Sequence, residues 1–349
     1  MALSGWSRGP SGLSRVYCTL GTGISYALLT VWAILCLFPF YWLAVTSLKD
    51  DRAIADGPAY VPFLDFVPTV RAWSFVLGDA SNKIVPYLAN SLIVSGAASL
   101  LATGFGGMAI YGMTRFRSTL PLGSLVWVLL AIVVASVAAI SGGFPERILA
   151  GFVAFAFIVL AIAMRHRGPM LKGASLMAAL LSTRLLPPVV VVIPLYLMMQ
   201  SLGWLETPLA LIAACATANL PVALWLLFPI LGSAATDPEE AALLDGASHF
   251  SIALTILLPM VAASVLAVSL LIFVLCWNEY LLAAFLTTNR SMTMTPWVIA
   301  QISSREAQIG SDAQEWANLS AALLLMSAPL LALAAVAHRL AARMTSTTR

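Results

Sequence analysis

Long uncharged apolar stretches dominate this chain and limit what it can fold into. The run from Gly21 to Leu48 contains no charged residue. A helix needs about 20 mostly apolar residues to cross the hydrocarbon core of a bilayer, and this run exceeds that length. It is also longer than the apolar region of a secretory signal, and no small-residue cleavage site follows it, so we expect a retained first span.

Similar stretches, bounded by charged or turn residues, recur along the sequence and predict an all-α polytopic membrane protein of about eight spans. The predicted spans are residues 22–47, 86–113, 121–141, 148–164, 174–198, 208–232, 260–286 and 317–338. Of all residues 61% are apolar and 9% are charged, whereas about a quarter are charged in an average soluble domain. Soluble enzymes, disordered chains and nucleic-acid-binding proteins are therefore excluded.

The positions of basic residues predict the orientation, because Lys and Arg in short loops stay on the cytoplasmic side. Arg8 and Arg15 place the N-terminus in the cytoplasm, and an even number of spans brings the C-terminus, with Arg343 and Arg349, to the same side. Residues 49–85 then form an external loop. The four cysteines are far apart and the three histidines are isolated, so we expect no metal site.

One predicted cytoplasmic loop, residues 236–259, breaks the rule because it contains no Lys or Arg. It carries four acidic residues instead: Asp237, Glu239, Glu240 and Asp245. A basic protein partner explains this composition better than lipid headgroups do.

The same loop contains signals for two short helices. Asp237 is a suitable N-cap, Pro238 suits the first helical position, and Glu240 can complete a capping box. Gly246 can end the helix in a left-handed conformation, and a second helical segment is expected from about Ser248 into the next span.

The spacing within this loop resembles the signature loop of the membrane subunits of binding-protein-dependent ABC importers. The pattern Glu-Ala-Ala, three residues, Gly, nine residues, Ile, one residue, Leu-Pro is matched by Glu240, Ala241, Ala242, Gly246, Ile256, Leu258 and Pro259. Further passages resemble the carbohydrate permeases of the maltose MalG type, in the same order along the chain. They are residues 38–42, 90–95, 111–116, 185–188, 193–196, 202–203 and 277–280.

The resemblance implies a six-helix type I permease core in the bacterial inner membrane, with both termini cytoplasmic. It further implies a subunit that forms half of the translocation path for a carbohydrate, polyol or sugar phosphate. In that family the signature loop docks into a groove of a cytoplasmic ATPase. The expected coupling residues are Glu239, Glu240, Ala241, Ala242, Asp245, Gly246, Ile256, Leu258 and Pro259.

The chain itself lacks the motif of an ATPase, since a glycine precedes none of its lysines Lys49, Lys83 and Lys172 as a P-loop requires. The resemblance therefore implies a partner that binds ATP and Mg, with no cofactor on this chain. The expected partners are a cytoplasmic ABC ATPase dimer, a second permease subunit, an extracytoplasmic solute-binding protein and the lipid bilayer, but no nucleic acid.

The chain departs from a six-span core by an inserted helical hairpin. We expect three regions: residues 1–117 with the first two spans, residues 118–165 with the hairpin, and residues 166–349 with the remaining core spans and the loop 236–259.

Two charges, Arg184 and Glu279, fall inside predicted spans, where ionisable residues usually line a path or pair with each other. Arg184 precedes two prolines that free backbone carbonyls, as beside transport sites. Asn278 and Tyr280 add groups that suit sugar hydroxyls, so we assign Arg184, Asn278, Glu279 and Tyr280 to a candidate translocation path. A buried structural pair, a snorkelling end and interfacial anchoring are the alternatives.

Two other classes of function are alternatives to an importer permease. An ion-coupled secondary transporter could use Arg184 and Glu279 but has no use for the signature loop. A polytopic membrane enzyme should show paired acids, a histidine cluster or a nucleophile with its base, and the sequence displays none of these.

Overall fold

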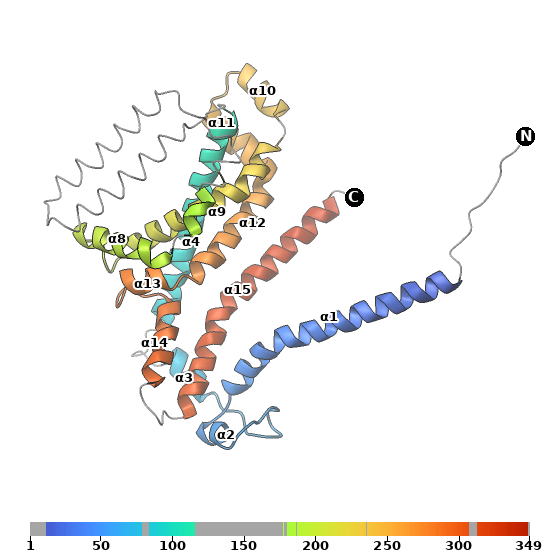
Figure 1. The fold of residues 1–349 in the computed structure, drawn as a ribbon, viewed down its shortest axis with the longest axis vertical. Coiled ribbons are helices and arrows are strands. Elements are labelled where there is room, and N and C mark those ends of the chain that lie inside the picture. Colours follow the sequence, from blue (N-terminus) through green and yellow to red (C-terminus); the bar gives the residue numbers. More distant parts are fainter. Residues whose placement is uncertain are drawn as a thin grey trace, which may run out of the picture. The chain divides into compact units, whose positions relative to one another are not determined.

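The computed structural model describes residues 12–78, 84–115, 177, 180–185, 187–234, 236–306 and 313–347. These residues form helices joined by short loops, which confirms the all-α prediction (Figure 1). The expected hairpin at 118–165, with its predicted spans 121–141 and 148–164, lies outside the described residues.

Five helical segments in the described part of the chain are long and apolar enough to cross a membrane. They are Gly21–Thr46, Ile84–Arg115, Pro208–Gly232, His249–Trp277 and Glu315–Arg339. Four of them coincide with the predicted spans 22–47, 86–113, 208–232 and 317–338. The total of eight spans stays a prediction.

The helix that contains the predicted span 260–286 starts just after Ser248, as the sequence predicts, but it breaks within the predicted span. The helical segment begins with α11 (His249–Ile252) and a π-helical turn (Ala253–Leu257), and α12 (Leu258–Trp277) ends before a break. Side chains explain the break, because Asn278 Nδ2 donates to the carbonyl of Val274 at 2.8 Å and Glu279 Oε1 accepts from the N–H of Leu282 at 3.1 Å. A short helix, α13 (Leu281–Leu286), then follows.

The predicted span 174–198 is also interrupted within its described residues. A 3₁₀ turn (Thr183–Leu185) precedes α8 (Pro188–Ser201). Pro187 and Pro188 explain the interruption, since proline has no N–H for the preceding turn and suits the first residue of a new helix.

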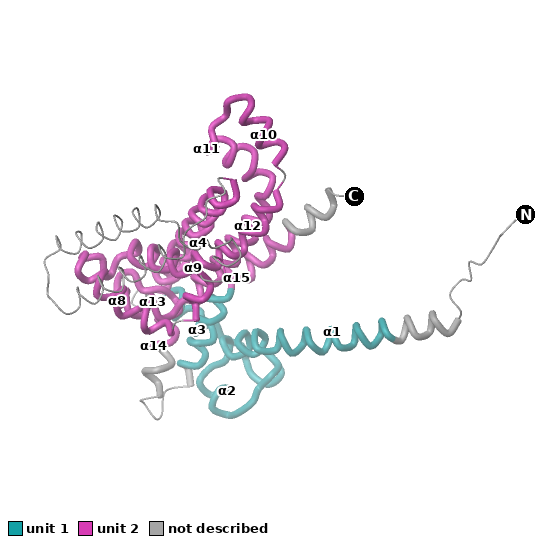
Figure 2. Tube along the Cα trace, turned by 45° about the horizontal axis from the view of Figure 1, so that its top comes forward, with its two compact units in different colours: residues 1–82, 308–327 teal, residues 83–307, 328–349 magenta. Residues whose placement is uncertain are grey.

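The chain divides into two compact units, shown in separate colours in Figure 2. Unit 1 covers residues 1–82 and 308–327 and contains α1 (Gly12–Thr46), α2 (Asp51–Ala55) and α3 (Arg71–Gly78). Unit 2 covers residues 83–307 and 328–349. The last helix, α15 (Ala313–Thr347), contributes to both.

The core of unit 2 is formed by α4 (Ile84–Arg115), α9 (Pro208–Gly232) and α12. The α4 and α9 backbones approach closely at Gly106, where an added Cβ would lie 3.3 Å from the Cβ of Ala223. Small residues of this kind allow helices to pack by van der Waals contact in lipid, where burial of apolar surface gives no driving force.

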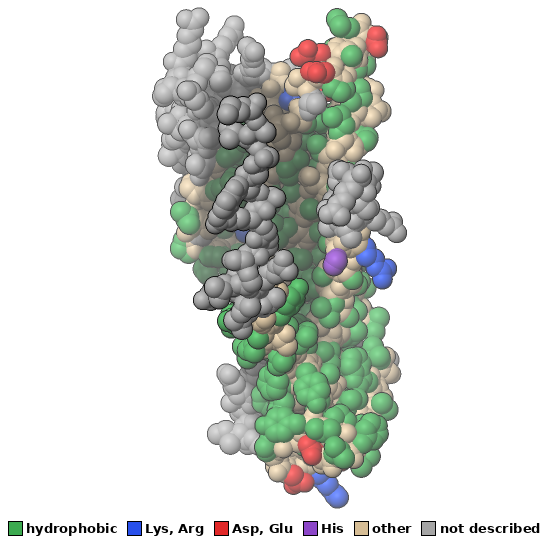
Figure 3. Space-filling view, turned by 90° about the vertical axis from the view of Figure 1, so that its right-hand side faces the viewer, with side chains coloured by type: hydrophobic (Ala, Val, Ile, Leu, Met, Phe, Trp, Pro, Cys, Tyr) green, Lys and Arg blue, Asp and Glu red, His purple; other side chains and the backbone are tan. Residues whose placement is uncertain are grey.

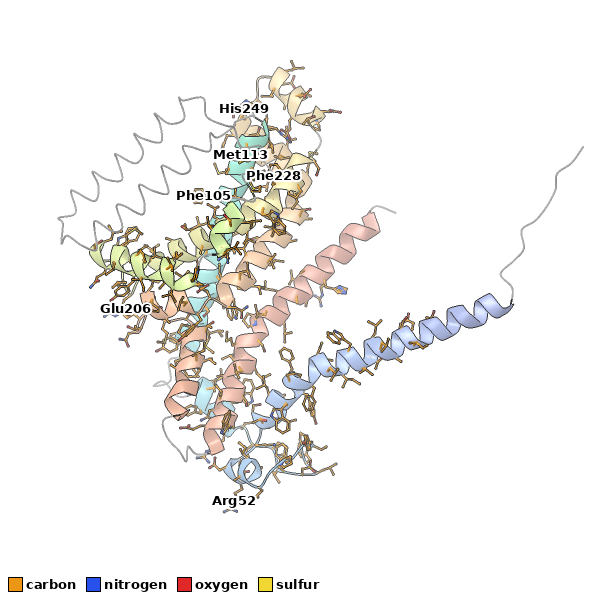
Figure 4. The ribbon with its side chains drawn as sticks, viewed as in Figure 1. Arg52, Phe105, Met113, Glu206, Phe228 and His249 are labelled. Carbon is orange, nitrogen blue, oxygen red and sulfur yellow. The ribbon has the colours of Figure 1, made fainter. Side chains whose placement is uncertain are left out.

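Glu206, which the sequence analysis did not single out, ties two loops of unit 2 together (Figure 4). It lies between α8 and α9 with a positive φ of 62°. Its carboxylate accepts from the N–H groups of Thr288 and Asn289 at 2.6 and 3.1 Å, and Ser291 Oγ donates to its carbonyl at 2.9 Å. Burial acts to raise the pKa of Glu206, but hydrogen bonds to its carboxylate from the Thr288 hydroxyl and from backbone N–H groups, including those of Thr288 and Asn289, hold the pKa below its usual value.

The same loop is held from α4 as well. Asn90 Nδ2 donates to the carbonyls of Arg290 and Met292 at 3.1 and 3.0 Å, and the N–H of Met294, the first residue of α14 (Met294–Glu306), donates to Ser91 Oγ at 2.8 Å. Residues 287–293 are therefore fixed to the start of α4 and to the α8–α9 loop.

Candidate functional site

Residues 236–259, here called the elbow, fold into two short helices as the sequence predicts. The first, α10 (Asp237–Leu244), ends in a left-handed turn at Gly246, whose φ is +82°. The N–H of Ala247 donates to the carbonyl of Ala242 at 3.0 Å, and that of Gly246 to Leu243 at 3.1 Å, which is the Schellman pattern. The second helix, α11, begins after Ser248, whose Oγ accepts from the N–H of Ser251 at 3.2 Å.

The predicted N-cap of α10 was wrong by one residue. Thr236 occupies the cap position, and its carbonyl accepts from the N–H groups of Glu239 and Glu240 at 3.0 and 2.9 Å. Asp237 belongs to the first turn, together with both glutamates. Three acids in the first turn are favourable there, because the N-terminus of a helix carries partial positive charge.

Glu239 points inward and pairs with Arg115, the last residue of α4. Arg115 Nη2 lies 2.6 Å from Glu239 Oε1, and Arg115 Nε lies 2.7 Å from Oε2. Both side chains are largely buried, with 14% and 5% of their surfaces exposed. Two parallel charge-assisted hydrogen bonds fix orientation as well as distance, so the first turn of α10 is held against the end of α4.

A second contact joins α4 to α11. Tyr111 Oη lies 3.3 Å from Nδ1 of His249, the first residue of α11, which is labelled in Figure 4. Tyr111 precedes Arg115 by four residues, so both side chains project from the same face of α4. Both helices of the elbow are therefore attached to one face of one long helix.

The outer surface of the elbow combines acidic and apolar side chains. Asp237, Glu240 and Asp245 are exposed, Leu244 is 90% exposed, and Phe250 is 63% exposed. Figure 3 shows acidic side chains (red) beside hydrophobic ones (green) at the top of the view, where the elbow lies.

The remaining predicted coupling residues connect the elbow to α12. Ala241 is exposed and Ala242 is half-buried on α10. Ile256 is half-buried in the π-helical turn, while Leu258 and Pro259 are exposed in the first turn of α12. No loop separates α11 from α12, so the elbow continues directly into a candidate span.

Arg184 contacts a residue that the sequence analysis missed. Its side chain is exposed, and Nη2 donates to Oδ1 of Asn219 in α9. Asn219 is 3% exposed and donates to the carbonyl of Cys215 at 2.9 Å and to Sγ of Cys276 at 3.3 Å. The signal that could have identified Asn219 is its position as an amide within the apolar run 208–232.

The other candidate path residues lie at the break between α12 and α13, just after the candidate span His249–Trp277. Asn278 and Tyr280 are exposed, and Glu279 is half-buried where it caps α13. Arg184 and Glu279 form no ion pair in the part of the chain that the structure describes. Arg184 is instead linked, through Asn219, to Cys276 shortly before the break.

Comparisons with known proteins agree with this architecture. Residues 158–346 match the family described as binding-protein-dependent transport system inner membrane component. The chain is 25% identical over 302 residues to the trehalose/maltose transport system permease protein MalG of Thermococcus litoralis, covering 86% of this chain and 87% of that protein. It is 26% identical over 317 residues to the diacetylchitobiose uptake system permease protein NgcG of Streptomyces coelicolor, covering 90% and 84%.

A solved structure shares the fold. It is the crystal structure of a bacterial ABC transporter involved in the import of the acidic polysaccharide alginate, with a TM-score of 0.62 and 16% identity. The likeness covers 95% of this chain and 99% of that chain. The resemblance to importer permeases that the signature loop indicated is confirmed.

Proposed function

This chain belongs to the family of binding-protein-dependent transport system inner membrane components, and from that premise we propose that the elbow is its ATPase-coupling element. The chain is a multi-pass inner membrane permease of an ABC importer and is not itself an ATPase. Membership in this family implies an ATPase and a solute-binding protein as partners. The family is distinct from the two alternative classes, ion-coupled secondary transporters and polytopic membrane enzymes.

The opposite orientation of two neighbouring glutamates carries the coupling proposal. Glu239 is used internally, where its pair with Arg115 fixes α10 to α4. Glu240 and the nearby Leu244 face outward. An outward acid beside a protruding leucine suits a groove with a basic rim and an apolar floor, because charge directs docking and burial of an apolar side chain favours association.

A coupling element also has to be stiff, and the elbow meets this requirement. The Schellman turn at Gly246 fixes the angle between α10 and α11, and α11 runs without a loop into α12. Motion of a docked ATPase would then move α4 and α12 as rigid bodies. The ATPase, acting as a dimer, would supply the ATP and Mg sites.

For the solute, we propose a carbohydrate, a polyol or a sugar phosphate. The trehalose/maltose and diacetylchitobiose permeases, whose names specify saccharides, are similar to this chain over most of its length. Arg184, held by Asn219, and the exposed Asn278 and Tyr280 offer donors and an aromatic face for hydroxyl groups. A second permease subunit would contribute the other half of the path, with both termini of this chain in the cytoplasm.

The decisive experiment introduces Glu240→Lys into this chain and tests whether the ATPase still co-purifies with it from native membranes. We expect the variant to insert normally but to lose the ATPase and solute uptake, because it reverses the charge at the docking surface. Asp56→Lys, at an exposed acid in unit 1, is the matched control and should retain both. Normal uptake and normal ATPase association in Glu240→Lys would contradict the coupling role.

A binding assay tests the solute class separately. The co-purified solute-binding protein is screened for thermal stabilisation by neutral saccharides, polyols and sugar phosphates. Stabilisation only by amino acids, peptides or metal ions would contradict the carbohydrate proposal while leaving the coupling proposal intact.

A further inference from the structure

The segment between α2 and α3 exposes an unusual cluster of apolar side chains. In the loop formed by residues 60–70, Phe63 and Leu64 are each 84% exposed, Val67 is 80% exposed and Val70 is 71% exposed. Single exposed apolar residues are ordinary on protein surfaces, but a contiguous group usually marks a contact. The 60–70 loop plays no part in the elbow or in the candidate path.

The 60–70 loop folds back along α1 instead of extending away from it. Tyr41 Oη donates to the carbonyl of Tyr60 at 2.7 Å, and the rings of Trp42 and Tyr60 lie 5.5 Å apart. Tyr41 precedes Thr46, the last residue of α1, by five positions, which corresponds to a rise of about 7.5 Å. Helical side chains lean toward the helix N-terminus, so the Tyr41 hydroxyl does not reach beyond that level.

The two contacts of Tyr60, with Tyr41 and with Trp42, are made to residues of a candidate span. Tyr41 and Trp42 belong to the candidate span Gly21–Thr46. In the most apolar 18-residue stretch of this span, only 6% is buried within the protein. Residues 21–41 of α1 are exposed throughout. The start of the 60–70 loop is therefore level with Tyr41, at the end of the exposed part of this candidate span.

Local hydrogen bonds of the exposed Asp65 and contacts of the buried Lys49 hold the loop in shape. The Asp65 carboxylate accepts from the N–H groups of Tyr60 and Val61 at 2.8 and 2.9 Å. Lys49 is only 3% exposed, and its Nζ lies 4.9 Å from the ring centroid of Trp42 and 5.6 Å from that of Phe66. These cation–π contacts and hydrogen bonds hold the loop in one conformation.

The backbone of Phe63 adopts an unusual conformation that no packing of its side chain explains. Its φ is +68°, in the left-handed region that a bulky residue rarely adopts, and its side chain is directed away from the protein. A strained residue persists only where its surroundings fix it, and such residues concentrate at functional positions.

We propose that the 60–70 loop is an interfacial membrane anchor that inserts Phe63, Leu64 and Val67 into the boundary between lipid headgroups and acyl chains beside α1. Aromatic and aliphatic side chains are favoured at this depth. Lipid is the occupant that the geometry favours, because the apolar surface of the loop continues the lipid-facing surface of α1. The anchor fixes the tilt and height of α1, and with them the position of the segment that follows it.

Collision measurements with a spin label test the anchor in the full complex. The complex is reconstituted in vesicles of phosphatidylethanolamine and phosphatidylglycerol, with its native cysteines replaced by alanine and a nitroxide attached at Leu64→Cys. We expect oxygen, which concentrates in lipid, to relax this label several-fold more effectively than a water-soluble nickel chelate. A label at Asp56→Cys, an exposed acid at the end of α2, should show the opposite order.

Two outcomes would overturn the proposal. Dominant relaxation by the nickel chelate at Leu64→Cys would place the loop in water. Weak relaxation by both reagents would show that another protein subunit covers it.

A photocrosslinking experiment avoids the cysteine-free background, which could fail to assemble. A benzophenone amino acid is introduced at Leu64 in the otherwise native complex, and at Leu35, which is 61% exposed on α1, as the control. We expect lipid adducts at both positions by mass spectrometry. Adducts to a partner protein at Leu64, or lipid adducts at Leu35 alone, would reject the anchor.

Discussion

Arg115 and Glu239 form a largely buried bidentate ion pair that joins α4 to α10 across 124 residues of sequence. Two neighbouring acids in α10 thereby divide two tasks: Glu239 holds the helix in place, and Glu240 faces outward. In the coupling that we propose, the pair gives α4 a part that the signature loop alone does not suggest, because a displacement of α10 would act on α4 directly.

We predict that removing one member of this pair loosens the elbow. Arg115→Leu leaves the Glu239 charge buried without its partner, a change that typically costs about 3–5 kcal/mol. Hydrogen exchange within residues 237–252 should become faster, and uptake should fall. The reversed pair, Arg115→Glu with Glu239→Arg, should recover part of both. Unchanged exchange in Arg115→Leu would show that the pair does not hold α10.

Substitutions at Gly246 should act through the backbone alone, because an added Cβ meets no atom within 4 Å. The φ of +82° should make Gly246→Ala cost about 1–2 kcal/mol and Gly246→Val more, whereas Gly246→Asn should cost less. Uptake at equal membrane abundance should follow the order Gly, Asn, Ala, Val. Full uptake by Gly246→Val would show that the turn does not need a positive φ.

We predict that the contribution of Glu206 to the stability of the protein depends on pH. Its pKa is lowered from an ordinary value of 4.5, so its stabilising effect is complete well above pH 4.5 and is lost as pH falls through the lower, folded-state pKa. Glu206→Gln should therefore lower the thermal midpoint of the purified complex at neutral pH. The difference from the unchanged protein should shrink in acid, as Glu206 becomes protonated. A constant difference at all pH values would contradict the assigned charge effect.

Arg184 and Asn219 should act together in transport. Arg184→Ala should reduce uptake or substrate-stimulated ATPase activity while leaving the complex assembled, because the Arg184 side chain is exposed. Asn219→Leu should have a similar effect, since it removes the group that orients Arg184. If uptake by the double variant Arg184→Ala/Asn219→Leu is no lower than uptake by either single variant, the two residues share one role. No change in either activity for Arg184→Ala would return it to a structural role.

Local sequence was sufficient where one residue type determines the conformation. Apolar runs longer than a bilayer requires predicted the described spans at 22–47, 86–113, 208–232 and 317–338, and Gly246 predicted the turn of the elbow. Each of these signals lies within one continuous segment of the chain.

Sequence failed where contacts over long distances decide the outcome. Glu239 and Glu240 look equivalent in sequence, and only the position of Arg115 in three dimensions separates their roles. The early end of α12 is a different case, because the hydrogen bonds of Asn278 and Glu279 are local, and a prediction from apolar runs alone does not include them. Asn219 gains its meaning only when α9 brings it to Arg184.

The unbroken helical stretch His249–Trp277 contains 29 residues and so spans about 43 Å, more than the hydrocarbon thickness of a bilayer. A rocking motion of about 5° pivoting at the His249 end displaces the Trp277 end by roughly 4 Å over that length. In the coupling that we propose, a small rotation at the elbow would thus produce a larger displacement at the far end of the helix, where the Asn278–Tyr280 break begins.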